Sequence, residues 1–152
     1  MKKLPPAVET AIAAYKQVKS VLPFGANNIE TNPYFGTDTL TMRINLSRMI
    51  AELLFLECSS ITESFRGRFH QYILFSAIMA EVYQAGNCEE QSAVAAFWLL
   101  SEGNMDTITL VRQKLDDHVY LAYTQDDLRI QLDPWKTCIE YTNSAKKIQA
   151  FI

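Results

Sequence analysis

Apolar residues recur every three to four positions along the first part of the chain, which is the spacing of amphipathic helices. The pattern predicts a first helix over residues 5–22, because two prolines suit a helix start and Pro23 ends the repeat. It predicts a second helix over 40–56 with a broad apolar face. Residues 23–38 between them are rich in glycine, asparagine and proline, so we expect a long loop there.

Two more helices are predicted to begin with a capping pattern. In this pattern a polar side chain accepts a hydrogen bond from the amide three residues on, and the carboxylate at that position reaches back. Ser60 with Glu63 has this spacing at the start of a third helix, and Asn87 with Glu90 repeats it at the start of a fourth. Cys88 therefore falls in the first turn of the fourth predicted helix.

After residue 103 the helical spacing gives way to runs rich in β-branched and aromatic residues, which predict strands over 107–112, 119–123 and 128–132. We expect a hairpin between the second and third strands, centred on Gln125-Asp126, through either a two-residue turn or a four-residue loop. This centre places apolar pairs on one face of the hairpin: Val119 with Leu132, Leu121 with Ile130, and Tyr123 with Leu128. On the other face it pairs His118 with Asp133.

The remaining polar segment, from Lys136 onward, is predicted to form a short helix or a docking tail. With 152 residues, of which 49% are hydrophobic, the chain has the length and composition of one compact domain. We therefore predict a single catalytic domain over 1–152 of the α+β class, in which a helical N-terminal half packs on a small antiparallel sheet.

Charge and hydropathy narrow the classes of partner. The 14 basic and 17 acidic side chains give a net charge of −3, which disfavours nucleic acid as a partner. The longest apolar run, residues 93–100, is shorter than the roughly 20 residues that span a bilayer, so we expect no membrane span. The N-terminus carries no apolar stretch typical of a secretory signal. These features predict a soluble protein.

The three cysteines, Cys58, Cys88 and Cys138, are an odd number with no spacing typical of a zinc site or a redox pair. We therefore expect a reducing compartment, with no metal and no cofactor. Cys58 and Cys138 are interpreted as packing residues. Cys88 differs because a helix N-terminus favours the thiolate, and we expect this position to lower the pKa of its thiol.

A histidine and a carboxylate can complete a site around this thiol. Asp133 can hold the imidazole of His118 in one tautomer and leave its other nitrogen to take a proton from Cys88. Gln84 and Asn87 are the candidate side-chain donors to an oxyanion, and Gln84 is preferred. If the apolar face of the hairpin packs on the Cys88 helix, His118 must reach over the strand edge. If the opposite face does, the contact is direct, and the sequence leaves this open.

The order of these residues resembles the papain-like and transglutaminase-like superfamily. The resemblance is carried, over about a third of the chain, by Gly86-Asn87-Cys88-Glu89-Glu90, Asp117-His118-Val119 and Leu132-Asp133-Pro134-Trp135. It implies a papain-like or transglutaminase-like core with Cys88 as nucleophile, His118 as general base and Asp133 as the group that orients it. In size the chain is most similar to bacterial effector cysteine peptidases and glutamine deamidases, which implies translocation from a bacterium into a host cytosol. The spacing is also similar to that of arylamine N-acetyltransferases.

Together these residues predict a thiol-dependent amide hydrolase that acts on a protein substrate, as a glutamine deamidase or a cysteine peptidase. An acyltransferase or transglutaminase needs the same triad, so the sequence does not separate hydrolysis from transfer. A third interpretation is a non-catalytic module whose helices over 40–56 and 61–83 bind a partner protein. The sequence does not indicate the oligomeric state.

Overall fold

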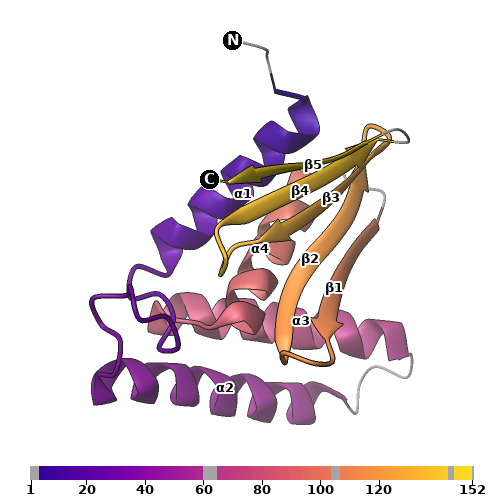
Figure 1. The fold of residues 1–152 in the computed structure, drawn as a ribbon. Helices are drawn as coiled ribbons and strands as arrows, with labels where there is room; N and C mark the ends of the chain where they lie inside the picture. The colour runs from indigo at the N-terminus through magenta and orange to yellow at the C-terminus, as the bar shows by residue number, and fades with distance from the viewer. Residues whose placement is uncertain (1–3, 60–64, 104–106, 144–145, 152) are drawn as a thin grey trace.

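The computed structural model describes residues 4–59, 65–103, 107–143 and 146–151 of the chain. In these parts four helices precede five strands (Figure 1). The helices are α1 (Pro6–Val21), α2 (Asp38–Ser59), α3 (Phe65–Tyr83) and α4 (Cys88–Glu102). The strands are β1 (Thr107–Gln113), β2 (His118–Gln125), β3 (Leu128–Asp133), β4 (Cys138–Asn143) and β5 (Lys146–Phe151). The predicted α+β class, with the helices first, is confirmed.

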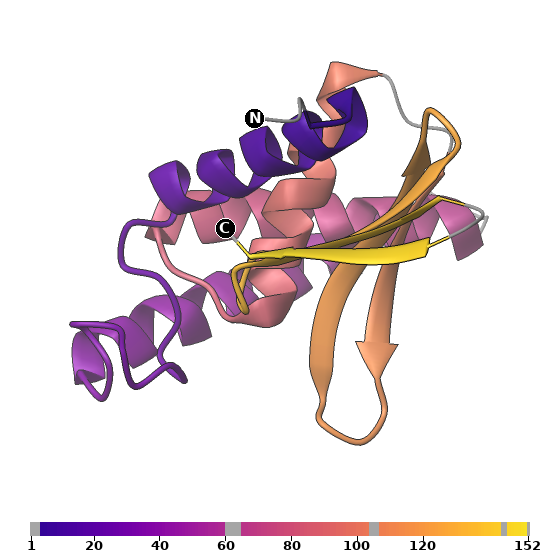
Figure 2. The ribbon, with the colours of Figure 1, turned by 45° about the horizontal axis from the view of Figure 1, so that its top comes forward.

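The strands form one antiparallel sheet in the order β1-β2-β3-β4-β5. Helices α1 and α4 pack on one face of this sheet, and α3 packs against the far side of α4 with α2 beside it (Figures 1 and 2). The main core lies between α1, α4 and the sheet, where the buried side chains include Leu99, Leu121, Ile130 and Leu132. Within the described residues no helix is both long enough and apolar enough to cross a bilayer.

Helix α4 is the central element because it contacts the sheet, α1 and α3. Its body is buried and made largely of small residues, which allow close approach on several sides: Ala93, Val94, Ala95 and Ala96. The capping pattern at its start is confirmed, since the Glu90 carboxylate accepts a hydrogen bond from the Asn87 amide at 2.9 Å. The Ser60 and Glu63 pattern lies outside the described residues, and α3 begins at Phe65.

The predicted loop between the first two helices is confirmed, and it is tied to the rest of the molecule. Gly25 forms a bridge with Ala85, next to the start of α4. The Asn32 side-chain amide donates to the carbonyls of Phe24 and Ala26, at 2.8 and 2.6 Å. These bonds hold the loop close to the α3–α4 connection, where the candidate site lies.

The hairpin register differs from the prediction by two residues. Instead of the expected pairs, Leu121 lies opposite Leu132 and Tyr123 opposite Ile130. The turn residues are Asp126 and Asp127, whose φ angles of 51° and 61° are those of a tight two-residue turn that matches the strand twist. Because side chains alternate with period two, a shift of two residues preserves the faces.

The same shift moves the predicted pair of polar residues. His118 and Asp133 still share the face opposite the apolar one, but Asp133 lies diagonally from His118 rather than directly across from it. Diagonal neighbours on one face of a sheet remain within reach of long or aromatic side chains.

The prediction of a short helix or docking tail after Lys136 is wrong. The segment forms β4, which pairs with β3, and β5, which pairs with β4. Ile139 lies opposite Leu132 and is fully buried in the core. The apolar positions Ile139 and Tyr141 alternate with polar neighbours, a period of two that a strand on an existing sheet requires.

The Asp126-Asp127 turn gives a test of the register. We expect the double substitution Asp126→Asn with Asp127→Gly to raise the free energy of unfolding by about 1 kcal/mol, because both positions have positive φ and this pair is favoured there. Urea denaturation would measure the change. Asp116→Gly is the matched control, since Asp116 lies in the other turn, without positive φ, and should not stabilise. Destabilisation by the double substitution would contradict the turn.

Candidate active site

His118 and Asp133 form a closely bonded and largely buried pair. The His118 Nε2 lies 2.5 Å from Asp133 Oδ2, with side-chain exposures of 6% and 14%. The second carboxylate oxygen accepts a hydrogen bond from the Lys136 amide at 3.0 Å, which holds the carboxylate in place. A carboxylate only accepts hydrogen bonds, so Nε2 carries the proton and Nδ1 is left as the basic nitrogen.

Aromatic rings surround this pair. The centroid of the Trp135 ring lies 5.1 Å from that of the His118 ring, and the two rings are tilted by 48°. The Tyr120 ring stacks on the His118 ring with a centroid distance of 6.4 Å. The Trp135 indole is held in turn, because its Nε1 donates to Asn28 Oδ1 at 2.9 Å. The loop before α2 therefore helps to place the ring that keeps water from the imidazole.

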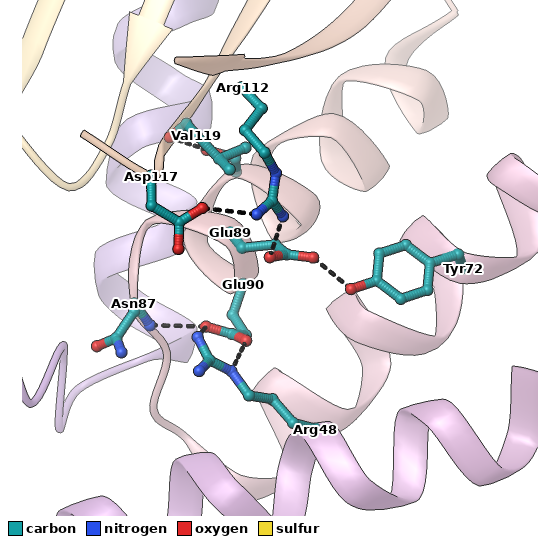
Figure 3. A network of polar contacts seen from close by, with 9 residues as sticks. Arg48, Tyr72, Asn87, Glu89, Glu90, Arg112, Asp117 and Val119 are labelled. Atoms are coloured by element: carbon teal, nitrogen blue, oxygen red, sulfur yellow. Dashed lines mark hydrogen bonds and ion pairs between the residues drawn. The ribbon is translucent and has the colours of Figure 1, made fainter. Parts of the chain in front are cut away.

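Cys88 is the first residue of α4 and lies near the start of β2. The backbones of Val119 and Glu89 are close enough to its sulfur to act on the pKa of the thiol. One turn further along, the Ser92 hydroxyl donates to the Val119 carbonyl at 3.2 Å. The first turn of α4 is thus attached to the residue that follows His118 (Figure 3 shows Val119 beside this turn).

The structure decides between the two arrangements that the sequence left open. The apolar face of the hairpin packs on α4, since Leu121 and Leu132 belong to the same core as α4. His118 is on the opposite face, at the start of β2, where it pairs with Gln113 of β1. Among the hydrogen bonds of the described residues, none joins the Cys88 sulfur to the His118 ring. The link between the two residues is indirect, through the backbone of Val119, which follows His118 and lies near the start of α4.

The expected lowering of the thiol pKa is not what the structure shows. Burial raises the pKa of the Cys88 thiol above its ordinary value, and the charges of Glu90 and Glu89 raise it further. The amides of Val119 and Glu89 lower it, but by less. The helix amides, on which the expectation rested, are outweighed by burial of the thiol, and the carboxylates at the start of the same helix add to the effect of burial. At neutral pH Cys88 therefore rests as a thiol.

The two carboxylates are fixed by a network that joins all the surrounding elements (Figure 3). Glu90 is held by Arg48 of α2 through two bonds, at 2.5 and 3.0 Å. Hydrogen bonding and charge from Glu90 raise the pKa of the Arg48 guanidinium. The salt bridge attaches α2 to the start of α4, and it crosses directly beside Cys88.

Glu89 binds groups from β1 and α3. Arg112 donates to Glu89 at 2.8 Å and to Asp117 at 2.7 Å, and the Tyr72 hydroxyl also donates to Glu89. Burial, followed by the bond to Glu89, raises the pKa of Tyr72 to about 12. Tyr72 is therefore a neutral donor at physiological pH, and Arg112 is shared between two carboxylates.

A cavity of about 580 Å³ opens beside the thiol, within the range of ligand sites. Cys88 forms part of its wall, α2 forms the opposite side, and the β1–β2 turn closes one end. The side chains that α2 contributes are Ser47, Arg48, Ala51, Glu52, Phe55 and Leu56. Sequence analysis missed them, because the apolar spacing of α2 predicted a packing face and gave no sign that its polar positions face a thiol.

Gln84, the preferred donor to an oxyanion, is not brought to this cavity. It ends α3 with a φ of 58°, its side chain is exposed, and it is not among the residues that line the cavity. Asn87 and Asn28 do line it. The Asn87 side-chain oxygen accepts from the Asn27 amide at 3.1 Å, so its NH₂ group is the one left for a ligand.

Cys58 and Cys138 are half-buried cysteines outside any disulfide, and neither lines this cavity. Within the described residues no group of three or more histidine, cysteine, aspartate or glutamate side chains is placed to hold a metal ion. Comparison of the chain with protein-family models, curated proteins and solved structures found no match. The functional argument therefore rests on the geometry of the site.

The raised pKa of Cys88 predicts how its alkylation depends on pH. We expect the iodoacetamide reaction of Cys88 to reach half its maximal rate above about pH 8.5, the ordinary thiol value. Glu89→Gln should lower this midpoint, because it removes a nearby negative charge and keeps the backbone amide. Peptide-resolved mass spectrometry would follow each cysteine separately. Glu102→Gln, at the exposed far end of α4, is the matched control and should change nothing. A midpoint well below 8.5 would contradict the electrostatics.

Proposed function

We propose that the protein is a thiol-dependent amide hydrolase with a papain-like or transglutaminase-like core, acting on a protein substrate through Cys88, His118 and Asp133. One observation carries the proposal: α4, which Cys88 begins, is hydrogen-bonded through Ser92 to the carbonyl of Val119, the residue next to His118, and the Val119 backbone lies near enough to the thiol to lower its pKa. His118 itself is oriented by Asp133 at 2.5 Å. The proposed nucleophile starts α4, the base starts β2 and the orienting carboxylate ends β3, so base and carboxylate lie at the same end of two neighbouring strands.

The resting protonation states define the mechanism. Because burial and two carboxylates keep Cys88 as a thiol, no preformed thiolate is expected, and the base must take the proton as the sulfur attacks. The Nδ1 of His118 is the free basic nitrogen for this step. Asp133 stabilises the imidazolium that forms, since its carboxylate already accepts the Nε2 proton.

The first half of the reaction forms a thioester. The Cys88 sulfur attacks the carbonyl carbon of the amide while its proton passes to His118. The carbon–nitrogen bond then breaks, and the imidazolium returns the proton to the leaving nitrogen, which departs as ammonia from a glutamine side chain or as an amine from a peptide bond. The acyl group remains on the sulfur.

The second half releases the product. A water molecule gives a proton to His118 and attacks the thioester, the carbon–sulfur bond breaks, and the sulfur regains the proton. The balance is one amide and one water converted into one acid and one amine or ammonia. The open cavity beside Cys88 supports this step, because water reaches the thioester through it.

The start of α4 supplies the groups that would stabilise the oxyanion. The backbone amides of a helix N-terminus point out of the helix, toward the charge that develops when a carbonyl is attacked. The NH₂ group of Asn87, which lines the cavity beside Cys88, is the candidate side-chain donor in place of Gln84. Asn87 thus both starts the helix and faces the reacting atoms.

One movement is required before the first step. The Cys88 side chain must turn away from the Val119 backbone toward the His118 ring, past the start of β2, while His118 keeps its bond to Asp133. Catalytic hydrogen bonds are often formed only once substrate is bound, so the resting contact with Val119 is compatible with this mechanism.

Triad variants test the proposal against synthetic glutamine-containing peptides, followed by intact mass. Cys88→Ala should abolish amide loss, because it removes the nucleophile. His118→Ala should slow the reaction by roughly 10²- to 10⁴-fold, the usual contribution of a general base. Asp133→Asn should slow it as well, since an amide does not stabilise the imidazolium. Cys58→Ala is the control, a half-buried thiol outside the cavity, and should keep full activity.

The products distinguish the alternatives. Conversion of the side-chain amide to an acid indicates deamidation, and a broken peptide indicates a peptidase. Incorporation of an added biotinylated amine indicates transfer. In that case the same triad would pass the acyl group to an amine instead of to water. Full activity in Cys88→Ala would overturn the assignment. Absence of every product across the peptide set would favour a non-catalytic binding module.

A further inference from the structure

The cavity beside Cys88 has an excess of negative charge. Its lining includes four carboxylates, Glu52, Glu89, Glu90 and Asp117, and two guanidiniums, Arg48 and Arg112, which leaves two negative charges in surplus. The fields of Glu90 and Glu89 are felt at the sulfur, whose pKa they raise. A cationic group entering this space is attracted, and an anionic one is repelled.

The two arginines do not offset this preference, because both are already occupied. Arg48 makes two bonds to Glu90, and Arg112 is divided between Glu89 and Asp117. Glu52 makes no ion pair with the side chains that the structure describes. The Glu52 carboxylate of α2 therefore lines the cavity without a counter-charge. At the β1–β2 turn, Asp117 shares the guanidinium of Arg112 with Glu89.

Aromatic and aliphatic side chains form the part of the wall near Glu52. Phe55 and Tyr72 pack edge to face, with ring centroids 5.8 Å apart, and both line the cavity with Leu56. Aromatic faces attract ammonium and guanidinium groups, while apolar walls accept the methylene stem that carries them. Lysine and arginine combine these two features in one side chain.

A buried polar atom in the same wall lacks a partner. Ser47 is 1% exposed, lines the cavity, and its hydroxyl oxygen has no hydrogen-bond partner among the described residues. An unsatisfied buried hydroxyl costs stability unless a ligand or water pairs with it. An ammonium or guanidinium provides only donors, which match this oxygen as an acceptor once the serine side chain turns to expose it to the cavity. Ser47 is an observation independent of the charge count.

We propose that the cavity is a specificity pocket for a lysine or arginine side chain of the protein substrate, next to the amide that Cys88 attacks. The inference rests on the proposed function and names the substrate class of the same site. Glu52 and Asp117 supply the charge, Phe55 and Tyr72 the aromatic wall, and Ser47 an acceptor within the pocket.

Matched peptides test this pocket. Each peptide contains one glutamine. One neighbouring position at a time, on either side of the glutamine, holds lysine, arginine, norleucine or glutamate. We expect kcat/KM for the best basic peptide to exceed that of its norleucine counterpart by about tenfold, a loss typical of one unpaired charge contact. The glutamate peptide should be the poorest substrate, because the cavity repels it.

Variants assign the preference to the pocket. Glu52→Gln should reduce the ratio between basic and norleucine peptides, mainly through KM, because it removes the carboxylate that has no counter-charge. Glu102→Gln has the same change of charge at the exposed end of α4, outside the cavity, and should leave the ratio unchanged. If Glu52→Gln leaves the ratio between basic and norleucine peptides as unchanged as Glu102→Gln does, the proposal is overturned.

Binding to the Cys88→Ala protein separates this inference from the proposed function. Fluorescence anisotropy with the same labelled peptides should show tighter binding of the basic ones. Turnover without a preference for lysine or arginine would overturn the pocket and leave the hydrolase standing. Preferential binding of basic peptides with no turnover by the native protein would overturn the hydrolase and support the pocket. If the native protein turns over no peptide and the Cys88→Ala protein shows no preference for basic peptides, both the hydrolase and the pocket are overturned.

Discussion

The contact between the start of α4 and the start of β2 is the interaction on which the site depends. The Val119 carbonyl accepts a hydrogen bond from the Ser92 hydroxyl, and the Val119 backbone lies near the Cys88 sulfur. This attachment needs a helix that is buried on several sides, and the small residues of α4 permit it. Because β2 also carries His118, the same contact that builds the core fixes the start of α4 relative to the strand on which the proposed base lies.

The carboxylates around Cys88 have opposing effects on structure and chemistry. Glu90 caps α4 and binds Arg48, and Glu89 joins β1 to α3 through Arg112 and Tyr72. Both make the thiol harder to ionise. In the proposed mechanism, His118 therefore takes the proton during attack, and no thiolate is stored. The same negative charges underlie the proposed preference for a positive side chain, so one set of carboxylates enters both proposals.

Much of the fold follows from local patterns in the sequence. Helical spacing predicted α1, α2 and α4, and the Asn87 and Glu90 pattern located the start of α4. Period-two alternation predicted which residues share a face of the hairpin, and this prediction survived an error of two residues in the register. The error arose because the turn depends on positive φ at Asp126 and Asp127, and aspartate adopts that conformation less readily than glycine or asparagine. β4 and β5 were missed because these short strands depend on pairing with a neighbouring strand, β3 for β4 and β4 for β5, which local sequence does not reveal.

The sequence by itself determined the class of the fold, the order of its helices, and the polar face that His118 and Asp133 share, because helical and strand periodicities are local properties of the chain. Only the tertiary structure decided the environment of Cys88. Glu89 and Glu90 are its neighbours in sequence, but Arg48, Tyr72, Arg112 and Val119 reach it from other elements. The pKa of a thiol depends on burial and on every charge within a few ångströms, and the packing of α2, α3, α4 and the β1–β2 turn sets both.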